Sequence, residues 1–267
     1  MPGAARRVIS ADGTSIAYDR TGSGPAVILV AGAFTDRTHP TLAAVAKALS
    51  PWFAVVNYDR RGRGESGDNQ PYAVEREIED LAALIDVSGG SAMVFGGSSG
   101  AALALRAAAQ GLAISKLALW EPPYHVDDGA PHLPDDFAAQ LDALVHAGRR
   151  GDAVELFMVR AAELPAAAVA AMRADPGWAA AETVAHTLAY EAAVLGPGNA
   201  FRAERFAAIA QPTLLLSGAD SPSWMANAAK AVAAAIPQTV HRILDGQTHN
   251  VAAEALTAEL LEFFTAG

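Results

Sequence analysis

A serine flanked by glycines is the sharpest chemical signal in this chain. Residues 96–100 are Gly-Gly-Ser-Ser-Gly, directly after an apolar run at 92–95 and directly before a helical pattern that begins at Ser99. This is G-x-S-x-G in a strand–turn–helix context, in which a tight turn exposes the serine hydroxyl. The N-terminus of the helix helps to stabilise negative charge there. We therefore predict that Ser98 is a nucleophile, with small residues around it because strand and helix pack closely.

A dinucleotide-binding loop is the competing interpretation of the same glycines. Glu121 follows them by about 20 positions, as the acidic residue of that fingerprint does. The fingerprint, however, requires glycines at i, i+2 and i+5, whereas here they stand at 96, 97 and 100. The P-loop pattern G-x-x-x-x-G-K-[ST] is missing too, and the chain has no cysteine for a thiolate metal site. We predict no cofactor and no metal.

A serine nucleophile needs a base, and His249 is the predicted one. It lies in the polar segment 245–250, between the last predicted strand and the last predicted helix. A base in such a loop, after the nucleophile and the acid in chain order, suits nucleophilic catalysis by serine. The other histidines fall inside a predicted strand (His241), at the start of a helix (His39) or in a long helical region (His125, His132, His146 and His186).

Two carboxylates compete for the role of the acid that orients His249. Asp220 follows the seventh predicted strand and precedes a helix, which is where the acid most often lies in this chain order. Glu121 ends the sixth strand, on the same carboxyl edge of the sheet. We favour Asp220 and keep Glu121 as the alternative. For the two backbone N–H groups that stabilise an oxyanion, we predict Ser99 and Ala33, the latter from the loop after the third strand.

Alternating strands and helices must position these residues. Eight candidate strands alternate with helical patterns, and from the third strand onward they are continuous apolar runs, typical of a sheet buried on both faces. This predicts an α/β fold with an eight-stranded, mostly parallel sheet, flanking helices and an antiparallel hairpin at one edge. The strands are predicted at 7–11, 15–20, 26–30, 53–57, 92–95, 116–120, 213–217 and 239–244.

One long region breaks the alternation. From about Pro122 to Ile209 there is no convincing strand, and the pattern predicts only helices, including Trp178–Leu195 and Asn199–Ile209. We interpret this region as an inserted, all-helical lid, with an elaborate crossover as the alternative. The predicted organisation is a core of residues 1–121 and 210–267 and a lid of residues 122–209.

Composition and charge exclude several classes of protein. Of the 267 residues 52% are apolar and 18% charged, which excludes a disordered chain. With 19 basic and 29 acidic residues the net charge is −10, so nucleic-acid binding is not expected. The longest apolar stretch, 26–34, is about half of what a membrane span requires. We expect no membrane partner, a cytoplasmic location, a small-molecule substrate, and a monomer or homodimer.

In these motifs the chain resembles the α/β-hydrolase superfamily, over roughly residues 8–121 and 211–265. Four motifs follow in the order typical of it: the loop 31–34, Asp-Arg-Arg-Gly-Arg-Gly-Glu-Ser at 59–66, the serine turn at 96–100, and Gly-Gln-Thr-His at 246–249. The second motif resembles a structural loop beside the active site. Two features depart from the family pattern. Ala31-Gly32 replaces the usual His-Gly, and Ser221 stands where the acid of the G-x-x-D-P motif belongs, one residue after Asp220.

The resemblance implies a serine hydrolase that cleaves a carboxylic ester, lactone or thioester through an acyl-enzyme on Ser98. The alternatives are cofactor-free perhydrolase, C–C hydrolase or lyase chemistry on the same residues, or a non-catalytic ligand receptor. An apolar, lid-covered site predicts a small, largely apolar substrate. The candidate pocket residues are aromatic or large: Phe34, Trp120, Tyr124, Trp178, Trp224 and Met225.

Overall fold

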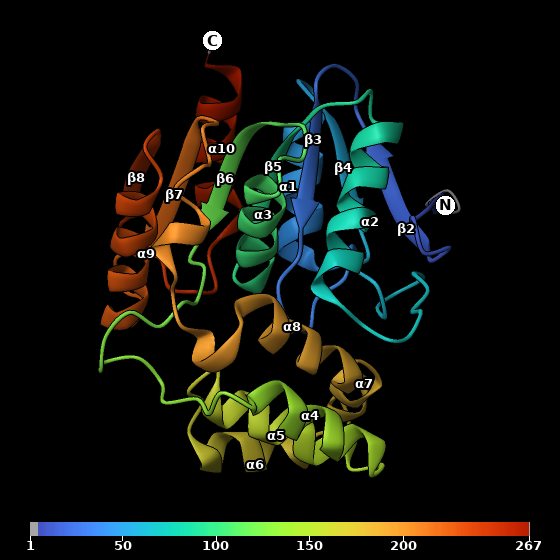
Figure 1. Cartoon of the computed structure of the whole chain (residues 1–267), viewed down its shortest axis with the longest axis vertical. Helices are drawn as coiled ribbons and strands as arrows, with labels where there is room; N and C mark the ends of the chain where they lie inside the picture. Colours follow the sequence, from blue (N-terminus) through green and yellow to red (C-terminus); the bar gives the residue numbers. More distant parts are fainter. Residues whose placement is uncertain (1–4, 267) are drawn as a thin grey trace.

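The structure, a computed structural model, describes residues 5–266, and an eight-stranded sheet runs through their centre (Figure 1). The predicted fold class, α/β with an eight-stranded, mostly parallel sheet and flanking helices, is confirmed. In chain order the strands are β1 (Arg6–Ile9), β2 (Ser15–Thr21), β3 (Ala26–Val30), β4 (Ala54–Tyr58), β5 (Ala92–Gly97), β6 (Ile114–Trp120), β7 (Thr213–Gly218) and β8 (Thr239–Leu244).

The order of the strands across the sheet is β1-β2-β4-β3-β5-β6-β7-β8. β1 and β2 form the predicted antiparallel hairpin at one edge, and β2 pairs antiparallel with β4. The strands from β3 to β8 pair in parallel, so the carboxyl ends of these strands lie side by side along one edge of the sheet, at right angles to the outer edge formed by the hairpin. The turns that carry Ser98, Glu121, Asp220 and His249 all leave from that edge.

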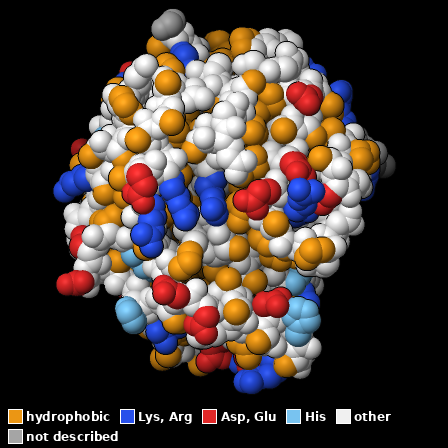
Figure 2. All heavy atoms as spheres, viewed as in Figure 1, with side chains coloured by type: hydrophobic (Ala, Val, Ile, Leu, Met, Phe, Trp, Pro, Cys, Tyr) orange, Lys and Arg blue, Asp and Glu red, His pale blue; other side chains and the backbone are white. Residues whose placement is uncertain are grey.

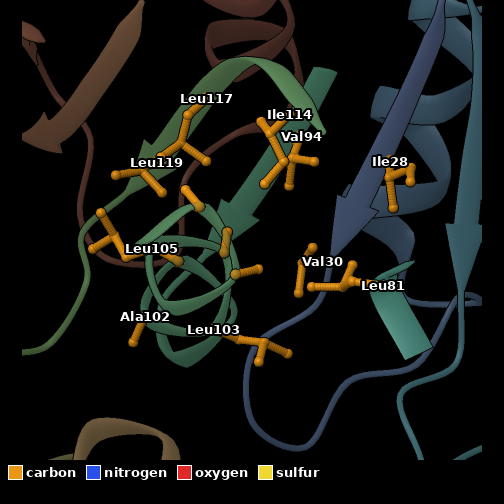
Figure 3. Packing of buried hydrophobic residues seen from close by; sticks show 14 of the residues in the cluster. Ile28, Val30, Leu81, Val94, Ala102, Leu103, Leu105, Ile114, Leu117 and Leu119 are labelled. Atoms are coloured by element: carbon orange, nitrogen blue, oxygen red, sulfur yellow. The ribbon is translucent and has the colours of Figure 1, made fainter. Parts of the chain in front are cut away.

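Successive residues of the central strands are buried on opposite faces, as a side-chain period of two requires. On β3, Val27 and Leu29 pack with α1 and α10, whereas Ile28 and Val30 pack with α2 and α3. Figure 3 shows the second face, where Val30 lies close to Leu81 and the leucines of α3 lie beneath the sheet. The flanking helices are α1 (Pro40–Leu49), α2 (Val74–Val87), α3 (Ser99–Ala109), α9 (Ser223–Ala235) and α10 (Ala253–Thr265).

A helical insertion, residues 122–209, connects β6 to β7 and lies across the end of the sheet toward which the parallel strands point (Figure 1). It has an apolar core of its own, in which Phe137, Leu141 and Val154 are buried. Its α8 faces the rest of the molecule and packs against α3. Its helices are α4 (Phe137–His146), α5 (Arg150–Arg160), α6 (Ala166–Arg173), α7 (Trp178–Thr183) and α8 (Leu188–Leu195).

Two predicted helices of the insertion are wrong. The segment Trp178–Leu195 is not one helix, because a 3-10 turn at Ala185–Thr187 separates α7 from α8 and the buried Thr187 hydroxyl donates to Val184 O at 2.8 Å. The segment Asn199–Ile209 contains only a short 3-10 turn, Ala203–Arg205. Two of its apolar side chains, Phe206 and Ile209, are still buried, and Phe206 packs on Tyr124 directly after that turn.

The surface carries charges of both signs. On the face drawn in Figure 2, acidic and basic side chains are interspersed. The arginines of the 59–66 motif are not part of the surface, because Arg60, Arg61 and Arg63 are each at most 2% exposed. Within residues 5–266, no helix has both the length and the apolar character needed to cross a membrane. No group of three or more His, Asp or Glu side chains in the same range could hold a metal ion.

Candidate active site

The turn between β5 and α3 holds Ser98 as the sequence pattern predicts. Ser98 has a φ of 55°, the left-handed conformation that a sharp strand-to-helix turn imposes on a serine. Close packing explains the flanking glycines. A Cβ on Gly96 would lie 2.5 Å from Gly100 O, and a Cβ on Gly100 would lie 2.4 Å from Val30 O. The geometry leaves Ser98 at the N-terminus of α3, beside the open end of the sheet.

His249 reaches Ser98 from the loop between β8 and α10. Its Nε2 is 3.1 Å from Ser98 Oγ, a hydrogen-bond distance. The same loop is held from beneath by Trp120, whose Nε1–H donates to His249 O at 3.0 Å. The backbone of the histidine is therefore fixed by the last residue of β6, a contact that no motif in the sequence indicated.

Glu121 supports the imidazole from its other side. Its Oε2 is 2.8 Å from His249 Nδ1, and its Oε1 accepts the Gly218 N–H at 2.8 Å. The carboxylate is fully buried between these two donors. Because a carboxylate only accepts hydrogen bonds, it holds the proton on Nδ1 and leaves Nε2 free to accept from Ser98.

Asp220, the favoured acid, makes no hydrogen bond or ion pair with His249 among the residues that the structure describes. Its side chain is exposed, and its backbone N–H donates to Gln247 O. Glu121 takes the place beside His249 Nδ1 and is also bound by Gly218 N–H at the end of β7, whereas the Asp220 side chain is exposed. The structure thus brings together Ser98, His249 and Glu121, the alternative acid, and leaves Asp220 at the rim of the adjoining cavity.

Two residues that line the same cavity as Ser98 have backbone N–H groups without an acceptor among residues 5–266. Ser99 is the first residue of α3, where an N–H has no intrahelical partner. Ala33 N–H donates to no acceptor in the part of the chain that the structure describes. The loop of Ala33 lies against Ser98, because a Cβ on its neighbour Gly32 would lie 3.1 Å from Ser98 Cβ. These are the two donors that the sequence predicts for an oxyanion.

A cavity of about 930 Å³ opens above these residues. Ser98, Ser99, Ala33 and His249 line one end of it. Three of the six predicted pocket residues, Phe34, Trp120 and Met225, line it. Side chains of the insertion complete its wall, and no motif in the sequence singled them out: Phe137, Phe157, Leu164, Ala192 and Leu195.

The other three predicted pocket residues lie elsewhere. Tyr124 is buried in the main core against Phe201 and Phe206. Trp178 is buried in the core of the insertion, and Trp224 lies edge-on to His125. None of these three side chains lines the cavity. Each buries its large aromatic surface against other side chains instead.

The 59–66 motif forms a buried ionic cluster next to the loop of Ala33. Arg60 makes a bidentate pair with Glu77 on α2, with N–O distances of 2.7 and 2.8 Å. Arg61 makes a second bidentate pair with Asp80 at 2.7 and 2.9 Å. Burial would raise the pKa of Glu77, but the charge and hydrogen bonds of Arg60 outweigh it, so the pKa lies below its usual range. Glu77 is therefore ionised at neutral pH.

Comparisons with known proteins agree with this architecture. Residues 27–260 match the model of the alpha/beta hydrolase family. The crystal structure of an alpha/beta hydrolase from Sphaerobacter thermophilus DSM 20745 is 52% identical and superposes with a TM-score of 0.90, covering 97% of this chain and 100% of that one. A thermophilic esterase from Thermogutta terrifontis is 22% identical with a TM-score of 0.74 over 98% of each chain, a likeness of fold alone.

One curated relative matches over a shorter stretch. The uncharacterized hydrolase YraK of Bacillus subtilis (strain 168) is 38% identical over 99 residues, which is 35% of this chain and 35% of that protein. The chain thus matches about a third of the length of that relative.

Proposed function

Because the chain belongs to the alpha/beta hydrolase family, we propose that it is a serine hydrolase that cleaves a carboxylic ester, lactone or thioester. The observation that carries the proposal is the hydrogen-bonded series Ser98–His249–Glu121, with distances of 3.1 and 2.8 Å. Nucleophile, base and orienting acid at these distances are the arrangement that activates a serine hydroxyl. The substrate is small, uncharged and largely apolar.

The proposed reaction has two halves. Ser98 Oγ attacks the carbonyl carbon while His249 Nε2 takes the hydroxyl proton, and the oxyanion of the tetrahedral intermediate lies between the N–H groups of Ala33 and Ser99. The intermediate collapses to an acyl-enzyme, and the departing alcohol or thiol takes the proton from His249. Water then attacks the acyl carbon as His249 removes its proton, and Ser98 regains that proton as the carboxylic acid leaves. Glu121 keeps the imidazole in the required tautomer throughout.

The charge of the cavity supports an uncharged substrate. Among the described residues that line it, the aromatic and aliphatic side chains dominate, no lysine or arginine is present, and two carboxylates, Glu163 and Asp220, contribute. An anionic substrate would meet these carboxylates without a cation to compensate its desolvated charge. The volume suits a small organic ester. We propose further that the insertion acts as a lid, that substrate choice depends on its Phe137 and Phe157, and that the protein is cytoplasmic and needs no cofactor.

Labelling with a fluorophosphonate tests the nucleophile directly. We expect a single adduct, mapped by peptide mass spectrometry to Ser98, and no adduct on Ser98→Ala. Hydrolysis of p-nitrophenyl butyrate by that variant should fall by about 10⁵–10⁶-fold, since the nucleophile of a serine hydrolase carries most of its rate enhancement. A folded wild-type protein that is not labelled would contradict the proposed function.

A matched pair of esters tests the charge of the substrate. The p-nitrophenyl esters of pentanoic acid and of succinic acid (as its mono-ester) have similar length but differ by one carboxylate. We expect kcat/KM to be at least about 100-fold higher for the neutral ester, because no cation lines the described cavity wall. Equal values would contradict the proposed substrate class and leave the nucleophile assignment intact.

A further inference from the structure

Two buried arginines hold the loop that carries Ala33, and they do so by its carbonyl groups. Arg60 Nη1 donates to Ala31 O at 3.1 Å. Arg63 Nη1 donates to Gly32 O at 2.5 Å and to Thr35 O at 3.2 Å. The Thr35 hydroxyl adds a second hydrogen bond to Gly32 O, at 2.8 Å. Successive carbonyl oxygens of the loop are thereby fixed on the side of the arginines.

The carbonyl of Gly32 belongs to the same peptide unit as the N–H of Ala33. In a planar trans peptide the C=O and the N–H point in opposite directions. Fixing Gly32 O on Arg63 therefore directs Ala33 N–H away from the arginine, and Ala33 lines the same cavity as Ser98 and Ser99. A flip of this peptide would point a carbonyl oxygen, and not a donor, at the developing oxyanion.

Glu191 on α8 compensates the charge of both arginines. Its Oε2 is 2.9 Å from Arg60 Nη1, and its Oε1 pairs with Arg63 Nη2. With Glu77 the cluster has two positive and two negative charges, all at most 2% exposed. Burial lowers the pKa of Arg63 to about 9, and the charge of Arg60 acts in the same direction. Because this pKa still lies above neutral pH, Arg63 remains protonated there. A buried cation of this kind keeps its position only with its counter-ion in place.

We propose that Arg63 and Glu191 are a positioning pair that fixes the Gly32–Ala33 peptide so that Ala33 N–H faces the oxyanion. The proposal rests on the proposed function, and it concerns residues that touch no reacting atom. It also gives α8 a second role. This helix lines the cavity with Ala192 and Leu195 and supports the oxyanion loop through Glu191, so the insertion takes part in the chemistry as well as in substrate binding.

Kinetics of Glu191→Gln and Arg63→Met test the pair, and Asp80→Asn is the matched control. Asp80 pairs with Arg61 of the same motif and is equally buried. Among the described residues, however, neither side chain makes a hydrogen bond to the 31–35 loop. All three variants remove one partner of a buried ion pair, so we expect each to lower the melting temperature, and Asp80→Asn to do so least because Arg61 keeps Asp12 as a partner. Only the first two should lower kcat per titrated active site, by about 10–100-fold with KM within about threefold, because an oxyanion donor acts in the transition state.

The rate of fluorophosphonate labelling supplies the second readout. We expect it to fall in Glu191→Gln and Arg63→Met and to stay within about twofold of wild type in Asp80→Asn, since the phosphonyl oxygen occupies the same hole. Arg63→Lys, which keeps a charged donor, should be faster than Arg63→Met. Equal rates for wild type and Glu191→Gln, or an equal loss in Glu191→Gln and Asp80→Asn, would overturn the positioning role. An unlabelled but folded wild type would overturn the proposed function itself.

Discussion

The loops after β6 and β7 each carry a carboxylate at the same edge of the sheet, but their environments differ. Glu121 is buried, with one oxygen on His249 Nδ1 and the other on Gly218 N–H. Asp220 is exposed at the rim of the cavity. The difference shows that burial and a second donor, Gly218 N–H, distinguish the carboxylate that orients the histidine from the one that does not.

The largest expected effect that separates the two loops comes from Glu121→Gln. Gly218 N–H needs an acceptor, so it orients the new amide with its oxygen toward Gly218 and its NH₂ group toward His249 Nδ1. That NH₂ favours the tautomer with a proton on Nε2, which cannot accept from Ser98. We expect kcat to fall by about 10³–10⁴-fold with the fold retained. Steady-state kinetics with p-nitrophenyl butyrate check this, and activity within tenfold of wild type would refute the role of Glu121.

A smaller loss is expected from Gly218→Ala, which disturbs the contact between the β7 loop and the histidine loop. A Cβ on Gly218 would lie 2.2 Å from Gln247 O, two residues before His249, so the histidine loop must shift. Because misplacement of a catalytic group by about 1 Å can cost about 100-fold, we expect kcat to fall by about 10–100-fold. Gly67→Ala, whose Cβ would meet only ordinary contacts, is the control. If both variants behave alike, the glycine at 218 has no special part in placing His249.

Trp120→Phe tests the support that β6 gives to the histidine backbone. The change removes the hydrogen bond to His249 O while keeping an aromatic ring. We expect kcat to decrease by about 3–10-fold, the loss of one neutral hydrogen bond. Trp178→Phe removes a comparable indole bond, to Glu182, inside the insertion and should leave kcat within about twofold. A kcat for Trp120→Phe as high as that of the Trp178 variant would argue against this support.

The smallest effect belongs to Asp220→Asn. Because the side chain is exposed and does not reach His249, we expect kcat on a neutral ester to change by less than about threefold. In the double variant, Glu121→Gln with Asp220→Asn, we expect kcat to lie within about threefold of the kcat of Glu121→Gln alone. A further large loss in the double variant would mean that Asp220 substitutes for Glu121, and the two loops would then share the role.

The sequence predicted the parts of the molecule that local rules decide. The eight strands, the tight turn at Ser98 and the loop of His249 follow from apolar runs, glycines and chain order, and the structure has them at the predicted places. The distinction between Glu121 and Asp220 depends on burial and on a backbone donor, Gly218, from a distant segment. Neither can be inferred from one loop's sequence.

The insertion was harder to predict, because alanine favours helix wherever it occurs. The break before α8 depends on the hydrogen bond of Thr187 and on burial of that residue, and Phe206 is buried directly after a 3-10 turn. These are tertiary effects that override helix propensity. The same holds for the pocket. Trp178 and Trp224 are no different in type from Trp120, and only packing decides which of them reaches the cavity.

Glu121 is the residue directly before the insertion, which begins at Pro122 and returns to the sheet shortly before β7. Ser98, Glu121 and His249 therefore all belong to the two segments outside it. Segment 122–209 can therefore be exchanged as a unit. A different set of helices, joined after Glu121 and before β7, would give the cavity new walls and leave the hydrogen bonds from Ser98 through His249 to Glu121 intact. On our proposal such a graft must still bring an acidic residue to Arg60 and Arg63, the requirement that Glu191 meets in this chain.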